Sequence, residues 1–219
     1  MPMGAEKIEV YFDRQAQPFD ELYSEQRTWR YVANRWLRRA LYQRVRLTVA
    51  ALQGLQDFSV LDVGCGSGRN SVAFLKSGAR RVVGIDLSEN MIRLAREYAR
   101  GLGVGSQCEF IRADALACPF QERFDVAVAL GVFDYIEDPR DILRRMAQLA
   151  DEIVIASFPR WSPVRAPLRK LRYWMRDCPV HFFNQKRLQQ ISRDAGLRDC
   201  EFLPLSGRAG WLLVGRVSQ

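Results

Sequence analysis

The stretch Val60-Leu-Asp-Val-Gly-Cys-Gly-Ser-Gly68 decides the fold, because an apolar run there enters a turn that contains three glycines. Glycine is favoured where a backbone bends sharply and where a ligand must approach without meeting a Cβ atom. A helix is expected directly after the turn, and the free N–H groups at a helix start attract a carboxylate or a phosphate. The stretch therefore predicts a strand, a ligand-binding turn and a helix in succession.

A dinucleotide-binding loop is the nearest rival interpretation, but its glycines follow the spacing Gly-x-Gly-x-x-Gly. Arg69 occupies the position of the third glycine in that pattern. Asp62 also lies within the strand end, where a carboxylate suits a bound cation better than a pyrophosphate. A tight glycine turn without a ligand is the remaining alternative.

Two further acids follow the next two predicted strands. Val82-Val-Gly-Ile-Asp86 ends a strand with a carboxylate that is suited to both hydroxyls of a ribose. After it, Leu87 or Met91 can offer an apolar face to an adenine, and Asp114 could accept a hydrogen bond from an adenine amino group. Three acids at successive strand ends, in register with a glycine turn, indicate one ligand site at the carboxyl edge of an open α/β sheet.

The rest of the chain alternates short β-branched runs with runs of helical periodicity, which predicts βαβ units and a parallel sheet. A C-terminal hairpin is expected to bring an antiparallel strand into this sheet. The predicted strands are Phe58–Val63, Arg81–Ile85, Glu109–Arg112, Phe124–Leu130, Glu152–Ser157, Arg198–Leu205 and Gly210–Val217. The predicted helices are Asn70–Ser77, Glu89–Leu102, Pro139–Leu149 and Gln185–Ala195, with one or two more within residues 18–53. We expect a helical cap over residues 1–55 and one core over residues 56–219.

Asp62-x-Gly64-x-Gly66-x-Gly68, Asp86 and Asp114 resemble the first three motifs of class I S-adenosylmethionine (SAM)-dependent methyltransferases. The resemblance covers residues 56–158 and, more loosely, the C-terminal hairpin. It implies a Rossmann-like α/β fold whose seven-stranded, mostly parallel sheet has an antiparallel last strand and helices on both faces. It also implies SAM as the cofactor, with S-adenosylhomocysteine (SAH) as its product. The cofactor-binding residues that it implies are Asp62, Gly64, Cys65, Gly66, Gly68, Asp86, Leu87, Met91, Asp114, Ala115 and Leu130.

The segment Leu130-Gly-Val-Phe-Asp-Tyr135, after the fourth predicted strand, narrows the chemistry. It lacks the Asn/Asp-Pro-Pro-Tyr/Phe sequence of enzymes that methylate adenine or glutamine amino groups, and the Pro-Cys pair of cytosine C5 enzymes. Its part Phe133-Asp134-Tyr135 and the opening Tyr11-Phe12-Asp13 are similar to small-molecule methyltransferases, magnesium-protoporphyrin O-methyltransferases among them. We therefore expect methyl transfer to an oxygen, or as second choice a nitrogen, of a small acceptor.

His181, Asp134 and Tyr135 are the candidate catalytic residues. Methyl transfer from a sulfonium is an in-line displacement that depends on alignment and on the exclusion of water. A carboxylate acceptor needs no base, whereas a hydroxyl or amine acceptor can use one. His181 is the only histidine of the chain, and its alternative role is that of a packed structural histidine. Residues 159–183 mix prolines, arginines and aromatic residues, which predicts a lid over the acceptor; an ordinary surface helix is the alternative.

The formal net charge of +8 and the isoelectric point near 9.6 favour an anionic or amphipathic acceptor. The excess lies in residues 27–46, with seven arginines and no acid, and in residues 160–187, with eight basic residues and one acid. Solvated basic faces are the alternative. Five cysteines without CxxC spacing and a single histidine predict no metal site. With no apolar run near ~20 residues and no secretory signal, we expect a cytoplasmic protein.

Two other functions stay open at this point. A nucleic-acid methyltransferase would use the two arginine clusters, and its binding would weaken with rising salt. A SAM-binding module without catalysis would keep the glycine turn and the three acids. The sequence leaves the oligomeric state undecided.

Overall fold

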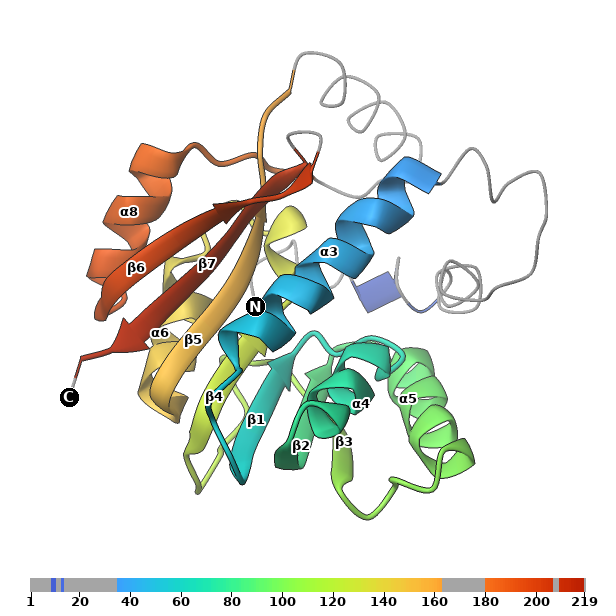
Figure 1. The fold of residues 1–219 in the computed structure, drawn as a ribbon. Helices are drawn as coiled ribbons and strands as arrows, with labels where there is room; N and C mark the ends of the chain where they lie inside the picture. The colour runs from blue at the N-terminus through green and yellow to red at the C-terminus, as the bar shows by residue number, and fades with distance from the viewer. Residues whose placement is uncertain (1–8, 11–12, 14–34, 163–179, 207–208, 219) are drawn as a thin grey trace.

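The computed structural model of the protein describes residues 9, 10, 13, 35–162, 180–206 and 209–218. Its centre is a seven-stranded sheet with the strand order β3-β2-β1-β4-β5-β7-β6 (Figure 1). β7 is antiparallel to both of its neighbours, and the other neighbouring strands are parallel. The strands are β1 (Phe58–Val63), β2 (Ala79–Asp86), β3 (Cys108–Arg112), β4 (Phe124–Ala129), β5 (Ala150–Pro159), β6 (Leu197–Pro204) and β7 (Gly210–Val217). The predicted Rossmann-like sheet with an antiparallel last strand is confirmed.

Helices cover both faces of this sheet (Figure 1). α3 (Arg35–Ala51), α4 (Arg69–Lys76) and α5 (Glu89–Gly101) pack on one face, and α6 (Arg140–Leu149) and α8 (Gln185–Asp194) pack on the other. Each face has its own hydrophobic core. β1 is buried at every position because it lies between these two cores, as a strand of a parallel sheet covered on both faces should be.

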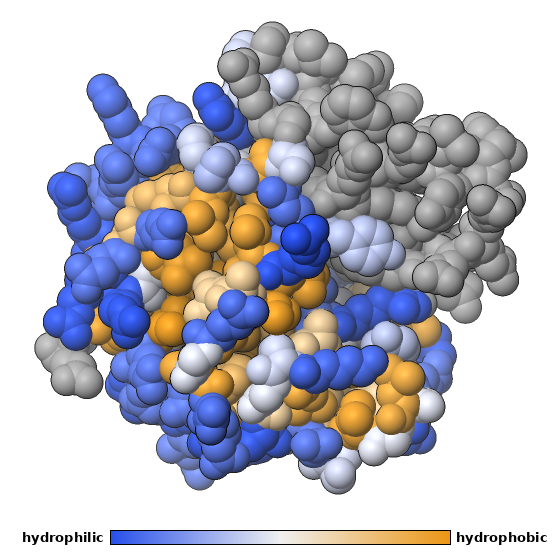
Figure 2. Space-filling model, viewed as in Figure 1, coloured by the Kyte–Doolittle hydropathy of each residue, from blue (hydrophilic) through white to orange (hydrophobic). Residues whose placement is uncertain are grey.

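The α3 face is covered less completely near β6 and β7. Leu203 and Val214 belong to the core on this face but are only partly buried. Figure 2 shows apolar surface gathered beside α3 over these strands. The glycine turn lies on the other side of α3, between the fully buried β1 and α4.

The predicted elements agree with the observed ones to within two residues at each end. β5 differs most, since it runs two residues further at both ends than predicted, and its pairing with β7 continues as far as Pro159 opposite Gly210. α3 falls within the helical region predicted over residues 18–53. Residues 1–8, 11–12, 14–34 and 163–179 lie outside the described residues, and most of the predicted cap and lid lies there. The proposed division at residue 55 stays a prediction.

The register of the sheet sets the geometry of the site. β1, β2, β3, β4 and β5 run in the same direction, so their carboxyl ends meet at one edge. Asp62 lies opposite Gly84 one strand away, and Asp86 lies opposite Arg112 on the next strand. The glycine turn and the strand-end acids therefore gather at this edge, as the sequence predicts.

Candidate functional site

The glycine turn between β1 and α4 is hydrogen-bonded to the end of β2. Gly64, Gly66 and Gly68 all have positive φ angles, of 67°, 53° and 75°. The backbone N–H groups of Gly64 and Cys65 both donate to the carbonyl of Ile85, at 2.8 and 3.0 Å. A left-handed backbone at three positions within five residues is compatible with glycine and strained for other residue types.

Only one of these glycines borders open space. A Cβ atom on Gly64 would lie 2.3 Å from Val132 Cγ2, and one on Gly68 would lie 2.9 Å from Ala95 Cβ. A Cβ atom on Gly66 would meet nothing within 4 Å. Neighbouring side chains leave no room for a Cβ atom on Gly64 or Gly68, so these two positions require glycine whether or not a ligand binds. The open side of the turn is at Gly66.

Asp86, at the end of β2, faces this open side. One carboxylate oxygen accepts from the Gly66 N–H at 2.9 Å, and the other accepts from the Ser88 N–H at 3.0 Å. Burial raises the pKa of Asp86 above its ordinary value, while the backbone N–H donors act in the opposite direction. Each oxygen still has acceptor capacity, so the carboxylate can take hydrogen bonds from two adjacent hydroxyls.

Asp62 lies deeper than the sequence indicates. It is buried at the end of β1, and its carboxylate accepts a hydrogen bond of 2.6 Å from the Ser71 hydroxyl on α4. Burial raises its pKa from 3.8 to about 7, with the nearby Asp86 adding to the rise and the Ser71 hydrogen bond opposing it. Asp62 therefore stabilises the turn from a buried position, through its hydrogen bond with Ser71 on α4. A charged ligand nearby would change the pKa of Asp62.

Replacing Asp62 with asparagine is expected to flatten the pH dependence of stability. Because the folded-state pKa is raised, the carboxyl is compatible with folding below about pH 4 and opposes folding increasingly as pH rises to about 7. The loss amounts to about 4 kcal/mol at most. Asparagine keeps an acceptor for Ser71 and does not ionise, so its unfolding free energy, measured in urea between pH 4 and 8, should fall less than that of the wild type. Parallel curves for the two proteins would contradict the raised pKa.

The residues predicted to meet an adenine differ in exposure. Asp114 is partly buried, and one carboxylate oxygen accepts from the Leu116 N–H at 2.9 Å. Leu87 and Ala115 are also partly buried. Met91 is 1% exposed and belongs to the core, so Leu87 is the better placed of the two predicted apolar contacts.

The segment after β4 lies beside the glycine turn. Leu130 ends the strand region, and Gly131 adopts a positive φ of 92° while its N–H donates to the Ser157 hydroxyl at 2.8 Å. A short 3-10 helix, η2 (Val132–Asp134), follows. Phe133 stacks on Phe158 of β5 with ring centroids 4.7 Å apart, and this contact fixes the helix on the sheet edge.

Asp134 and His181, two of the candidate catalytic residues, lie side by side. The backbone N–H of His181 donates to the backbone carbonyl of Asp134 at 3.0 Å, although almost fifty residues separate them in the chain. Asp134 and Tyr135 are buried, and the imidazole is partly buried. Burial lowers the pKa of His181 below its ordinary value; Glu137 opposes this shift and Arg187 adds to it. At neutral pH the imidazole is therefore largely neutral and able to accept a proton.

Arg44 is a site residue that the sequence reasoning did not single out. Its side chain is 9% exposed, and one guanidinium nitrogen lies 3.7 Å from an Asp134 carboxylate oxygen. Within the described part of the chain its Nε atom is buried without a hydrogen-bond partner. A Cβ atom on Gly131 would lie 3.3 Å from the guanidinium, so the positive charge lies against the β4 edge. Helical spacing from the buried Thr48 and Leu52 is the signal that separates Arg44 from the other arginines of the cluster.

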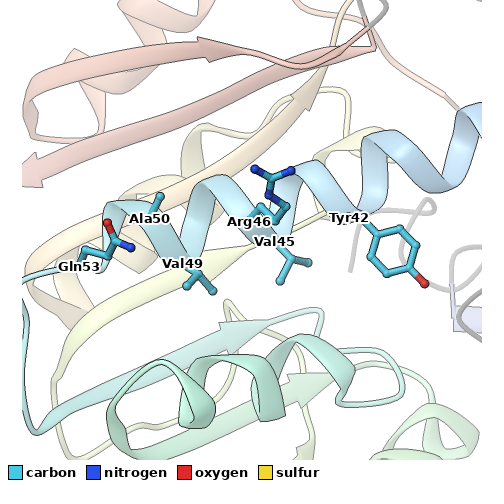
Figure 3. A pocket seen from close by; sticks show the side chains of 6 residues that line it. All are labelled: Tyr42, Val45, Arg46, Val49, Ala50 and Gln53. Atoms are coloured by element: carbon cyan, nitrogen blue, oxygen red, sulfur yellow. The ribbon is translucent and has the colours of Figure 1, made fainter.

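A surface pocket on α3 does not share this chemistry. It is lined by a stripe along the outer side of the helix, as Figure 3 shows: Tyr42, Val45, Arg46, Val49, Ala50 and Gln53. None of the sequence-predicted residues contributes to it. Its described lining residues include no acid, histidine or cysteine.

The described residues contain no group of three histidine, cysteine or acidic side chains placed to hold a metal ion. No helix within the described ranges is both long and apolar enough to cross a membrane. Of the cysteines in these ranges, Cys65 and Cys108 are buried, and Cys118 and Cys200 are partly buried.

Comparison with known proteins decides the family. The model of a methyltransferase domain family matches residues 60–152, which span the glycine turn and all three strand-end acids. A ubiquinone biosynthesis O-methyltransferase of Ralstonia nicotianae is 38% identical over 166 residues, which cover 68% of each protein. The chain belongs to the SAM-dependent methyltransferase family. Members of this family use SAM as the methyl donor, and the predicted cofactor class agrees with this membership.

Other relatives of this methyltransferase are matched over shorter segments. An enzyme of the same name from Leptothrix cholodnii is 37% identical over 107 residues, which cover 48% of this chain and 43% of the relative. The chain spans less than half the length of several curated relatives that it matches. The structure of magnesium protoporphyrin IX methyltransferase from Synechocystis PCC 6803 with bound SAH has a TM-score of 0.79 and 23% identity, and covers 96% of this chain and 98% of that one. This likeness concerns the fold.

Proposed function

We propose that this methyltransferase transfers a methyl group from SAM to an oxygen of a small molecule. The proposal rests mainly on the position of Asp86 at the open side of the glycine turn, where it accepts a hydrogen bond from the Gly66 N–H. A carboxylate with two available oxygens fits a ribose diol. The relatives from Ralstonia nicotianae and Leptothrix cholodnii, both named as O-methyltransferases, support oxygen as the acceptor atom.

The described residues fit each part of SAM. Asp86 would bind the ribose hydroxyls, Asp114 the adenine amino group, and Leu87 the adenine face. The methionine end carries a carboxylate, and a buried guanidinium with an unpartnered Nε atom is the group that such an anion requires. We therefore assign this carboxylate to Arg44, which lies beside Gly131 after β4, two strands away from Asp86 at the end of β2.

SAM, when bound, supplies an electrophilic methyl group on a sulfonium. The work left to the chain is to align the acceptor oxygen, exclude water and remove a proton. Leu130 and the loop that follows would lie below the donor, because Val132 packs against Gly64 of the turn. His181 would accept the acceptor's proton, and the hydrogen bond to the Asp134 carbonyl would hold its backbone in place.

Replacing His181 with glutamine is expected to lower kcat for a hydroxyl acceptor by about 100-fold or more, the usual contribution of general base catalysis. The affinity for SAM should stay within a factor of two, since the imidazole lies on the acceptor side. The wild-type rate should rise with pH through a value below 6.5, because burial lowers the pKa of His181, and this rise should vanish in the variant. An unchanged kcat and pH profile would leave His181 a structural residue.

Calorimetric titration with SAM, SAH and NAD+ tests the cofactor. We expect micromolar binding of the first two and none of NAD+. Tritium transfer from labelled SAM to a panel of phenols and carboxylic acids then tests the acceptor atom, since the products are ethers in one case and esters in the other. Binding of SAM without transfer to any acceptor would favour the alternative of a SAM-binding module without catalysis.

We also propose that the acceptor is anionic or amphipathic. The basic excess of the sequence supports an anionic or amphipathic acceptor, and the same charge would serve a nucleic acid. Binding of a short RNA that weakens steeply between 50 and 200 mM salt would favour the nucleic-acid alternative. The cytoplasmic location stays a prediction.

A further inference from the structure

The turn between β2 and α5 is held by two residues from the start of the chain. Asp13 accepts hydrogen bonds from the Ser88 hydroxyl and from the Asn90 N–H, the latter at 3.3 Å. Glu9 forms an ion pair of 2.6 Å with Arg112, whose Nε atom also donates to the Leu87 carbonyl at 3.1 Å. Both contacts converge on the residues that directly follow Asp86.

These contacts join segments that lie more than seventy residues apart in the sequence. They differ in expected strength. The side chains of Glu9 and Arg112 are 32% and 52% exposed, and an ion pair of this kind contributes little. Asp13 is partly buried and places a carboxylate at the N-terminus of α5, where both the free N–H groups and the helix dipole favour an anion. Asp13 is therefore the stronger of the two attachments.

We propose that Asp13 is a latch residue: its carboxylate bridges Ser88 and Asn90, holds the turn after Asp86 beside the ribose end of the cofactor site, and so limits the rate of cofactor exchange. The inference rests on the proposed function, because it places the ribose at Asp86. The chain then contributes a contact at each end of the cofactor, with Asp13 beside the ribose and Arg44 at the methionine carboxylate. Release of the cofactor then requires the turn after Asp86 to move, and the contacts of Asp13 oppose this movement.

Electrostatics couples the latch to the ligand. Asp13 lies close enough to Asp86 for its charge to oppose ionisation of the buried carboxyl. The two carboxylates repel each other. Hydrogen bonds from the ribose hydroxyls would spread the charge of Asp86 and so reduce this repulsion. Cofactor binding therefore strengthens the latch, and by reciprocity the latch strengthens binding.

The test measures release of tritiated SAH from the protein into an excess of unlabelled SAH. Asp13→Ala removes both hydrogen bonds and should speed release about tenfold. Asp13→Asn keeps an acceptor for Ser88 and Asn90 and should stay within about threefold of the wild type. Glu97→Gln is the matched control, since it breaks an ion pair with Arg93 on the same helix and away from the turn. Its release rate should equal that of the wild type.

Hydrogen exchange of the Asn90 amide provides a second readout. This N–H lies in the first turn of α5 and has no intrahelical acceptor, so its protection reports the contact with Asp13. Asp13→Ala should raise its exchange rate about tenfold and leave β1 amides unchanged, which also shows that the variant is folded. Equal SAH release in all variants, or an unprotected Asn90 amide in the wild type, would overturn the latch. A wild type that binds no SAH would refute the proposed function instead. Hydrogen exchange of the Asn90 amide would then still show whether Asp13 holds the turn after Asp86.

Discussion

Replacing Asp86 with alanine should weaken binding of SAM and SAH by a factor of about 100 or more. Each hydrogen bond to a charged group contributes about 1.5–3 kcal/mol, and the carboxylate would make two to the ribose. The change also leaves the N–H groups of Gly66 and Ser88 without their acceptors, so the unfolding free energy should fall by about 1–3 kcal/mol. Calorimetry and urea unfolding measure the two effects separately.

Asp125 provides a matched control for this experiment. It accepts hydrogen bonds from the Ser59 N–H and hydroxyl at 2.6 and 2.7 Å. Because β1 and β4 begin at these residues, it lies at the opposite edge of the sheet from the glycine turn. Asp125→Ala should therefore lower stability to a similar degree and leave SAM affinity unchanged. Wild-type affinity in Asp86→Ala would show that the ribose is bound elsewhere.

Replacing Arg44 with methionine should weaken SAH binding by about 30-fold or more, since a buried charge-assisted pair with the ligand carboxylate is lost. The same change should not affect binding of 5′-methylthioadenosine, which has the adenosine part but no amino acid. Asp86→Ala, in contrast, should weaken both ligands. Equal loss of the two ligands in the Arg44 variant would contradict the assignment of the methionine carboxylate to the guanidinium.

Stability needs its own control at Arg44. Removing the guanidinium leaves the buried Asp134 carboxylate without this partner, and breaking a buried ion pair costs about 3–5 kcal/mol. In the double variant Arg44→Met with Asp134→Asn no buried charge is left uncompensated, so most of this stability should return. The ligand preference should persist, because it depends on the guanidinium alone. A double variant that recovers SAH binding would show that the single change acted through misfolding.

The order of strands and helices in the core follows from local sequence. Apolar runs such as Phe58–Val63 are long enough to identify strands, and turn residues mark their ends. The position of Asp86 at a strand end was also predictable, because parallel strands bring their carboxyl ends to one edge whatever the detailed packing. These features depend on residues close together in the chain.

The roles of individual side chains depended on the tertiary structure. Arg44 and Arg46 have the same charge in the sequence, and the packing of α3 against the β4 edge buries the first and leaves the second exposed. Asp62 could be predicted at a strand end, but its depth and its raised pKa follow from α4 folding over it. Asp13 and Ser88 lie 75 residues apart in the chain, so no local sequence pattern predicts their contact.

The sequence by itself therefore determined the sheet, the glycine turn and the acids at its edge, because strand periodicity and glycine conformation are local properties of the chain. The tertiary structure decided which charges are buried and what they face. Burial and electrostatic partners arise from contacts between distant segments, and these contacts set the pKa of Asp62, the exposure of Arg44 and the attachment of Asp13.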